Sequence, residues 1–245
     1  LALAQTYHRL VPSGVHRLLR DLAELLPVSD RNMSFDFKVR RALAGLSYPA
    51  SMWNPAWLAP VGPDAMASLC EEPLAPEELY SEAIGRWDKA RPQLSLIDRT
   101  LEFYTTFYLP DNILTKVDRA SMMSSLESRA VFLDNDLVAF CQRLPHRFKY
   151  RKGTRKYLLK RALERDLPAN IIRRPKKGFG IPLAKWLRSE PPVLPLDPVP
   201  GIRMDRVRQA WIEHREGRRD HRLFLWSWLS LQSALRGYLG RSDAA

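Results

Sequence analysis

The sequence lacks the compact motifs with which many enzymes hold a phosphate, a metal or a nucleophile. It has no GxxxxGK(S/T) loop, no GxGxxG, no HExxH and no GxSxG. No plausible nucleophile has a base beside it, and the five histidines are scattered along the chain: His8, His16, His146, His214 and His221. Independent nucleophilic catalysis and zinc chemistry are therefore not expected, and we assign no metal-ligating residue.

Cysteines and long apolar runs are also scarce. The two cysteines, Cys70 and Cys141, lie far apart and without the spacing of a metal site. Cys141 falls in the apolar stretch LVAFCQRL, which favours a reduced thiol packed in the interior. No stretch stays apolar long enough to span a membrane, so we expect a cytoplasmic protein without a membrane partner.

Acidic residues are too few to balance the basic ones, which leaves a formal net charge of +12. The excess is concentrated at 147–161, 173–177 and 203–222. Such segments suit nucleic acid, anionic surfaces, phosphate-bearing ligands or an acidic partner domain. For 203–222 we favour a simpler interpretation, a solvated helix face rich in arginine.

The coarse pattern of the 245 residues is helical, with few strand signals and no repeat. The segment 15–27 places five leucines on one face, and further helices are expected over 34–46, 76–90, 94–109, 113–126, 135–144 and from 155, the last capped by Gly153-Thr154. The proline-rich segment 47–75 is expected to be an irregular connection, and Pro191–Pro200 a surface linker. The apolar tail 221–239 should pack on the body of the protein.

Residues 108–134, YLPDNILTKVDRASMMSSLESRAVFLD, form the first segment that suggests chemistry. After a break at Pro110-Asp111, helical spacing brings Asp111, Thr115, Asp118 and Met122 near one face, with Lys116 and Arg119 beside it. Such a helix could hold a substrate ammonium or a magnesium ion while its cations face phosphates. The alternative from spacing alone is an intrahelical ion pair on a solvated face.

The end of this segment has a different character. Glu127 and Arg129 are expected to pair with each other and orient the chain. The apolar residues 130–133 indicate a short buried stretch, followed by a helix cap at Asp134 or Asp136.

The second informative segment is RRPKKGFGIP at 173–182. Gly178 and Gly180 allow a tight turn close to a ligand. A lysine in such a loop can hold phosphate oxygens as a point charge, or offset the charge that develops on a departing pyrophosphate.

The two segments, in this order and spacing, resemble the C-terminal part of the synthetase domain of glutamine-dependent asparagine synthetases and related amidotransferases. The resemblance covers residues 80–240 well and 1–80 loosely. It implies an α/β fold of the adenine-nucleotide α-hydrolase-like class, of which residues 1–245 would be a C-terminal, predominantly α-helical portion. The SGGxDS phosphate loop and the N-terminal glutaminase domain of the family have no counterpart in this sequence, so we expect a fragment of a longer protein.

The resemblance also implies a reaction and its participants. ATP and Mg²⁺ would activate the side-chain carboxylate of aspartate as an acyl-adenylate, and ammonia from glutamine, supplied by the glutaminase domain, would displace AMP. The catalytic lysine of the family falls on Lys176, with Lys177 as second choice, and its acidic residue falls on Asp118 or Asp111. Lys176, Lys177 and Arg119 would contact the nucleotide. A homodimer is one assembly left open.

Three alternatives remain at this stage. A related amidotransferase could act on another carboxylate, of the surface-polysaccharide or β-lactam type. A basic helical nucleic-acid-binding module would use 147–177 and 203–222, although the sequence shows no aromatic-interleaved recognition motif for it. A truncated or regulatory paralogue would have no activity.

Overall fold

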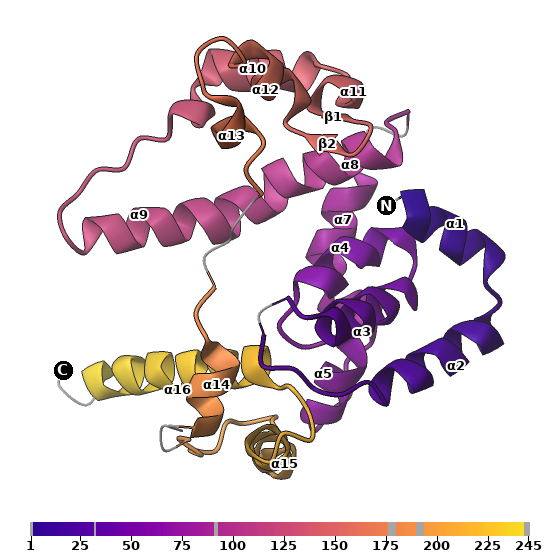
Figure 1. Cartoon of the computed structure of the whole chain (residues 1–245). Coiled ribbons are helices and arrows are strands. Elements are labelled where there is room, and N and C mark those ends of the chain that lie inside the picture. Colours follow the sequence, from indigo (N-terminus) through magenta and orange to yellow (C-terminus); the bar gives the residue numbers. More distant parts are fainter. Residues whose placement is uncertain (1, 32, 91–92, 176–179, 190–193, 243–245) are drawn as a thin grey trace. The chain divides into compact units, whose positions relative to one another are not determined.

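The computed structural model describes residues 2–31, 33–90, 93–175, 180–189 and 194–242. The chain divides into two compact units, which are treated separately below. Unit 1 consists of Leu1–Gly85 and Gly180–Ala245, and unit 2 of Arg86–Phe179. The prediction of a predominantly helical chain is confirmed, and within the described ranges the only strands are the two of one short hairpin (Figure 1).

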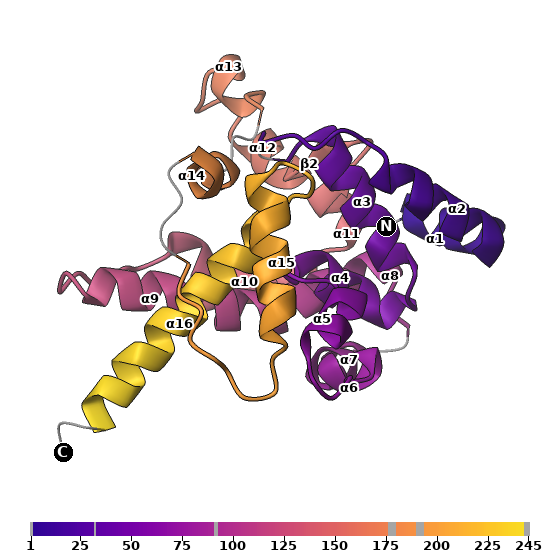
Figure 2. The ribbon, with the colours of Figure 1, turned by 90° about the horizontal axis from the view of Figure 1, so that it is seen from below.

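In the described part of unit 1, all elements longer than a single β-bridge are helices. They are α1 (Ala2–Leu10), α2 (Ser13–Glu24), α3 (Phe35–Leu46), α4 (Ala50–Leu58), α5 (Pro63–Leu69), α6 (Pro76–Leu79), α7 (Ser81–Asp88, whose end enters unit 2), α14 (Leu183–Ser189), α15 (Met204–Arg215) and α16 (Arg222–Ser242). α14, α15 and α16 pack against one another, and α3 packs against α2 and α4 (Figure 2).

The expectation of an irregular connection over 47–75 is wrong, because α4 and α5 occupy much of it. Pro49 lies immediately before α4 and Pro63 is the first residue of α5, positions where a missing N–H and a fixed φ do not oppose a helix. Burial reinforces α4, since Met52 and Trp53 are almost completely buried. At these two positions proline marks the start of a helix rather than a loop.

The core of unit 1 joins residues from both of its chain segments. Its cluster comprises Val61, Leu69, Leu183, Leu187, Leu194, Val207, Leu225 and Trp228. The predicted packing of the tail on the body is confirmed by the complete burial of Leu225 in α16. The surface linker expected over Pro191–Pro200 is wrong for the described residues from Leu194 onward, because Leu194 is buried and the indole N–H of Trp228 donates to the Pro195 carbonyl at 2.8 Å.

The leucine-rich face of α2 is not buried to the same degree. Leu18, Leu22 and Leu25 are 57, 51 and 78% exposed. The periodicity therefore identified the helix correctly but does not correspond to a closed core in the part of the chain that the structure describes.

Unit 2 contains a long helix followed by several short elements (Figure 1). They are α8 (Leu96–Phe103), the π-helix η1 (Tyr104–Leu114), α9 (Thr115–Met122), the 3₁₀ turn η2 (Val131–Leu133), α10 (Asn135–Arg143), α11 (His146–Lys149), β1 (Tyr150–Arg151), β2 (Thr154–Arg155), α12 (Tyr157–Ala162) and α13 (Ala169–Ile172).

The strands β1 and β2 replace the helix cap expected at Gly153-Thr154. Lys152 and Gly153 both have positive φ, 45° and 81°, which is the requirement of a two-residue type I′ hairpin turn. The register pairs Tyr150 with Arg155 and Arg151 with Thr154. The cap prediction is thus wrong, because glycine here serves a turn, and α12 begins only after Lys156.

The packing of α3 on α4 generates a stability prediction. A methyl group on Gly45 would overlap the indole ring of Trp57, so Gly45→Ala should lower the free energy of unfolding by about 1–3 kcal/mol, as overpacking does. Gly85→Ala in α7 is the matched control, because its methyl group would meet no described atom within 4 Å. The control should be neutral or stabilising by up to about 1 kcal/mol.

Urea denaturation of both variants, followed by tryptophan fluorescence, measures this difference. Equal stabilities of the two variants would contradict the close approach of α3 and α4.

Candidate active-site segments

The candidate site begins with one continuous helix, formed by α8, η1 and α9 in succession (Figure 1). Ser95 caps its start, because the Ser95 hydroxyl oxygen accepts a hydrogen bond from the Asp98 N–H at 3.1 Å. The break predicted at Pro110-Asp111 is wrong. Pro110 lies inside the π-helical stretch, and the Thr115 hydroxyl donates to the Pro110 carbonyl at 2.9 Å. The helix therefore passes a residue that lacks an N–H by changing its hydrogen-bond pattern.

Aromatic packing fixes the first half of this helix. Phe103 is 2% exposed and lies edge-on to Trp87, with ring centroids 6.4 Å apart. The guanidinium of Arg99 lies over the Trp87 ring at 4.9 Å and donates to the Trp87 carbonyl. This half is anchored inside unit 2, whereas every residue of α9 except Ser121 is exposed.

A polar pair near the helix start was not anticipated. Nδ1 of His146 lies 3.2 Å from a carboxylate oxygen of Asp98, and the Ser95 hydroxyl donates to the same carboxylate at 2.7 Å. Burial acts to raise the pKa of Asp98, but the hydrogen bonds of Ser95 and His146 outweigh it and the pKa lies below its usual value. Asp98 is therefore held as a carboxylate by its neighbours.

The predicted site residues on the helix, Asp111, Asp118 and Arg119, are all exposed. Within the described ranges, none of their side chains makes an ion pair or a hydrogen bond, so the intrahelical pair considered as the alternative is not formed. A π-helical turn takes more residues than an α-helical one, which shifts Asp111 from the face that α-helical spacing would give it. No contact between Asp111 and Asp118 brings the two carboxylates together.

The basic loop is described only in part. Arg173 and Arg174 follow α13, and both are exposed. Lys176 and Lys177 lie outside the described residues, as does Gly178. The description resumes at Gly180.

The segment between α9 and α10 confirms two predictions and corrects two others. Arg129 and Glu127 form an ion pair at 2.9 Å, and the Asp134 carboxylate caps α10 by accepting from the N–H groups of Asp136 and Leu137. The buried stretch over 130–133 is wrong, because Val131 is 81% exposed. The packed thiol predicted for Cys141 is also wrong, because Cys141 is exposed.

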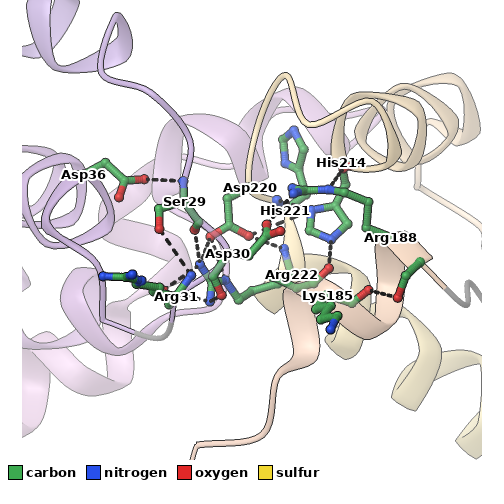
Figure 3. A network of polar contacts seen from close by, with 12 residues as sticks. Ser29, Asp30, Arg31, Asp36, Lys185, Arg188, His214, Asp220, His221 and Arg222 are labelled. Atoms are coloured by element: carbon green, nitrogen blue, oxygen red, sulfur yellow. Dashed lines mark hydrogen bonds and ion pairs between the residues drawn. The ribbon is translucent and has the colours of Figure 1, made fainter.

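A network of polar contacts in unit 1 was not predicted (Figure 3). Arg222, at the start of α16, forms an ion pair with Asp220 at 2.6 Å, and each side chain is only 7% exposed. The Arg222 guanidinium also donates to the backbone carbonyls of Ser29, Asp30 and Arg31 at 3.1–3.4 Å. The expected solvated face over 203–222 therefore ends in a buried cation.

His214 of α15 is completely buried in the same cluster. Its Nδ1 accepts the backbone N–H of His221 at 3.2 Å, and its Nε2 lies 3.3 Å from the Ala184 carbonyl, an arrangement that requires the neutral, Nε2-protonated ring. Burial lowers the pKa of His214 accordingly. Arg188 of α14 donates to the His214 carbonyl at 3.0 Å and pairs with Asp30.

This cluster joins parts of the fold rather than forming a reaction site. Apart from one guanidinium nitrogen of Arg188, its buried polar atoms have partners within the cluster or the backbone. No local sequence pattern predicts this cluster, because residues 29–31 and 222 are separated by most of the chain.

Two further features bear on ligand sites. An open pocket of about 640 Å³ lies between α1 and the start of α4, lined by Gln5, Thr6, His8, Arg9, Pro49, Ala50 and Trp53, and no predicted site residue lines it. Across the described ranges, no group of three or more His, Cys, Asp or Glu residues is placed to hold a metal ion, and no helix has the length and apolarity of a membrane span.

Comparisons with known proteins bear directly on the two predicted segments. Residues 14–236 match the family described as asparagine synthase, a span that includes both segments. A putative glutamine-hydrolysing asparagine synthetase of Mycobacterium tuberculosis H37Rv is 36% identical over 159 residues, which are 62% of this chain and 23% of that protein. Asparagine synthetase 1 of Bacillus subtilis is 37% identical over 83 residues, 34% of this chain and 13% of that protein.

A second Bacillus subtilis protein, asparagine synthetase 3, is 38% identical over 109 residues, 44% of this chain and 16% of that protein. In each of these relatives, the matched part is less than a quarter of the length. No solved structure matches the chain.

The burial of neutral His214 makes stability depend on pH. The unfolded histidine takes up a proton near pH 6.5, whereas the folded pKa is lower. Below about pH 6.5 the unfolded state therefore binds more protons, and the free energy of unfolding falls as the pH drops toward the folded pKa. The variant His214→Gln should have a free energy of unfolding about 1–3 kcal/mol lower than wild type at pH 7. Because it lacks the imidazole, its stability should not show this part of the pH dependence.

Urea unfolding at pH 7, 6 and 5 gives the measurement, with His8→Gln in the exposed part of α1 as control. The stability gap between wild type and His214→Gln should narrow toward pH 5, while the control keeps the wild-type slope. A gap that stays constant over this range would contradict the neutral, buried state of His214.

Proposed function

The chain belongs to the asparagine synthase family, and on this basis we propose that it forms part of an ATP-dependent amide ligase that makes asparagine from aspartate. The proposal includes ammonia derived from glutamine by a glutaminase domain, a cytoplasmic location, and the adenine-nucleotide α-hydrolase-like fold for the complete synthetase domain. The observation that supports this proposal most is the family match over residues 14–236. This span includes both segments that carry the resemblance, residues 108–134 and 173–182.

The proposed reaction has two steps. An oxygen of the aspartate side-chain carboxylate attacks the α-phosphorus of ATP, which forms an acyl-adenylate and releases pyrophosphate. Ammonia then attacks the acyl carbon, which forms the amide and releases AMP. The first step requires cationic groups that offset the charge of the departing pyrophosphate, and we assign this role to Lys176, with Lys177 as a second contact.

The described residues suit a magnesium nucleotide in their chemistry. Mg²⁺ in such sites takes one or two carboxylates, keeps several waters and bridges substrate phosphates. Asp118 on α9 offers an exposed carboxylate without an internal partner, and Arg119 beside it offers an exposed guanidinium. Asp118 would thus hold the metal and Arg119 a phosphate, and the metal would supply charge neutralisation.

Asp111 is the second candidate for the same role, since no cationic residue adjoins it in the sequence as Arg119 adjoins Asp118. The π-helix itself supports a functional assignment for this region, because π-helical turns occur frequently at functional sites.

The lysine assignment is tested by the variants Lys176→Ala and Lys177→Ala in the complete natural protein. Removing a group that stabilises transition-state charge typically lowers kcat by about 100- to 1,000-fold. We expect this loss in aspartate-dependent pyrophosphate release for Lys176→Ala, a loss of less than tenfold for Lys177→Ala, and unchanged glutamine hydrolysis in both. Undiminished pyrophosphate release by Lys176→Ala would remove this lysine from the mechanism.

The acid assignment is tested by Asp118→Asn and Asp111→Asn, which keep side-chain size and remove one charge. If Asp118 holds the metal, its variant should need at least tenfold more Mg²⁺ for half-maximal rate, an order of magnitude typical for perturbed metal sites. Asp111→Asn should resemble wild type. The reverse ranking would transfer the role to Asp111, and two normal variants would exclude both acids.

The acceptor is tested separately with alternative carboxylates. We expect aspartate to support faster pyrophosphate release than sugar acids or β-amino acids. A preference for one of the others would leave the ligase chemistry in place and move the protein to a related amidotransferase reaction.

A further inference from the structure

A basic hairpin in unit 2 is not explained by the proposed reaction. It comprises residues 147–161, from α11 through β1 and β2 into α12 (Figure 1). The segment RFKYRKGTRKYLLKR contains no acidic residue and eight cationic ones: Arg147, Lys149, Arg151, Lys152, Arg155, Lys156, Lys160 and Arg161. Mutual repulsion of these charges works against the folded state, and a bound anion would offset it.

Few carboxylates of the described residues neutralise the cations of the basic hairpin. Arg161 forms an ion pair with Glu164, and the charge of Lys149 contributes to lowering the pKa of Asp98. The other six cations have no carboxylate partner in the described part of the chain. Arg147, Arg151, Lys152, Arg155 and Lys156 are exposed.

The hairpin register gives its two faces different roles. Arg151 donates to the Tyr157 hydroxyl at 3.1 Å and lies 5.2 Å from the centre of the Tyr157 ring, so its side chain is held against Tyr157. Tyr150 and Arg155 are cross-strand partners, and their side chains therefore share the opposite face. Tyr150 is 47% exposed. The partly exposed ring of Tyr150 thus lies beside Arg155, which has no carboxylate partner in the described residues. This arrangement was not predicted from the sequence.

The backbone of the hairpin carries two lysines in a rare conformation. Lys152 and Lys156 have φ of 45° and 55°, in the left-handed region that asparagine and glycine occupy more readily. A type I′ turn usually begins with such a small residue. The presence of lysine at these positions places cations at the turn and at the start of α12 at some conformational cost, a pattern associated with functional sites.

From these observations we propose that the basic hairpin binds single-stranded nucleic acid. A base stacks on Tyr150, and consecutive phosphates contact Arg155, Lys152 and Lys156. Aromatic stacking combined with a cationic track is the usual physical basis of such binding. An extended strand fits better than a small phosphate compound, because the cations are spread over exposed surface and none of them lines the described pocket.

The test measures fluorescence anisotropy of a labelled twelve-nucleotide single strand titrated with the full chain. Contacts to about three phosphates should give a slope of about −2 in a plot of log affinity against log salt concentration. Tyr150→Ala should weaken binding about tenfold, in line with the loss of one stacked base, while Tyr150→Phe keeps the ring and the affinity. Circular dichroism verifies that each variant is folded.

Two variants with the same change of charge distinguish binding at the hairpin from an effect of the net charge of the protein. Arg155→Glu should weaken binding about tenfold, whereas Arg208→Glu, an equal change of charge at an exposed position of α15, should change it less than twofold. Equal losses in this pair would overturn the proposal. So would an unaffected Tyr150→Ala variant, equally tight binding of duplex DNA, polyglutamate or anionic vesicles, or no binding at low salt.

Discussion

The buried ion pair between Arg222 and Asp220 is the interaction on which unit 1 depends. Unit 1 is discontinuous in sequence, since the chain leaves it after Gly85 and returns at Gly180. The guanidinium of Arg222 joins the two parts through the carbonyls of residues 29–31, and both charges are removed from water. Removal of one partner of a buried pair is strongly destabilising, because the other charge is left uncompensated. Neutral His214 and Arg188 extend this connection to α15 and α14.

The inserted unit 2 carries the candidate site on a helix of unusual construction. Its first half is anchored by Phe103 and Trp87, and its second half projects exposed acidic and basic side chains. Between the halves, the π-helix accommodates Pro110 and sets the relative angle of Asp111 and Asp118. An exposed carboxylate with no internal partner stays solvated and is available to a cation, and the proposed role of Asp118 requires this availability.

The sequence was informative wherever a feature is decided locally. Helix periodicity, the Asp134 cap and the pairing of Glu127 with Arg129 all involve residues within a few positions of each other, and they were predicted. The predictions that were wrong concern residues whose structure depends on their position in a helix or on residues far away in the sequence. Pro49 and Pro63 stand at helix starts, where a missing N–H leaves no hydrogen bond unmade, and Pro110 is tolerated because the helix changes its hydrogen-bond pattern. The backbone carbonyls that accept from Arg222 lie about 190 positions away, beyond the reach of any local pattern. The placement of Lys176 stays a prediction from resemblance.

The central claim is that the complete protein activates aspartate by adenylation. Aspartate labelled with ¹⁸O in its side-chain carboxylate tests it most directly. In the proposed reaction one carboxylate oxygen becomes bonded to the α-phosphorus and leaves with AMP when ammonia attacks the acyl carbon. Mass spectrometry should therefore find AMP that carries one ¹⁸O for each asparagine formed. Unlabelled AMP, or ¹⁸O in inorganic phosphate with ADP as the nucleotide product, would contradict the account.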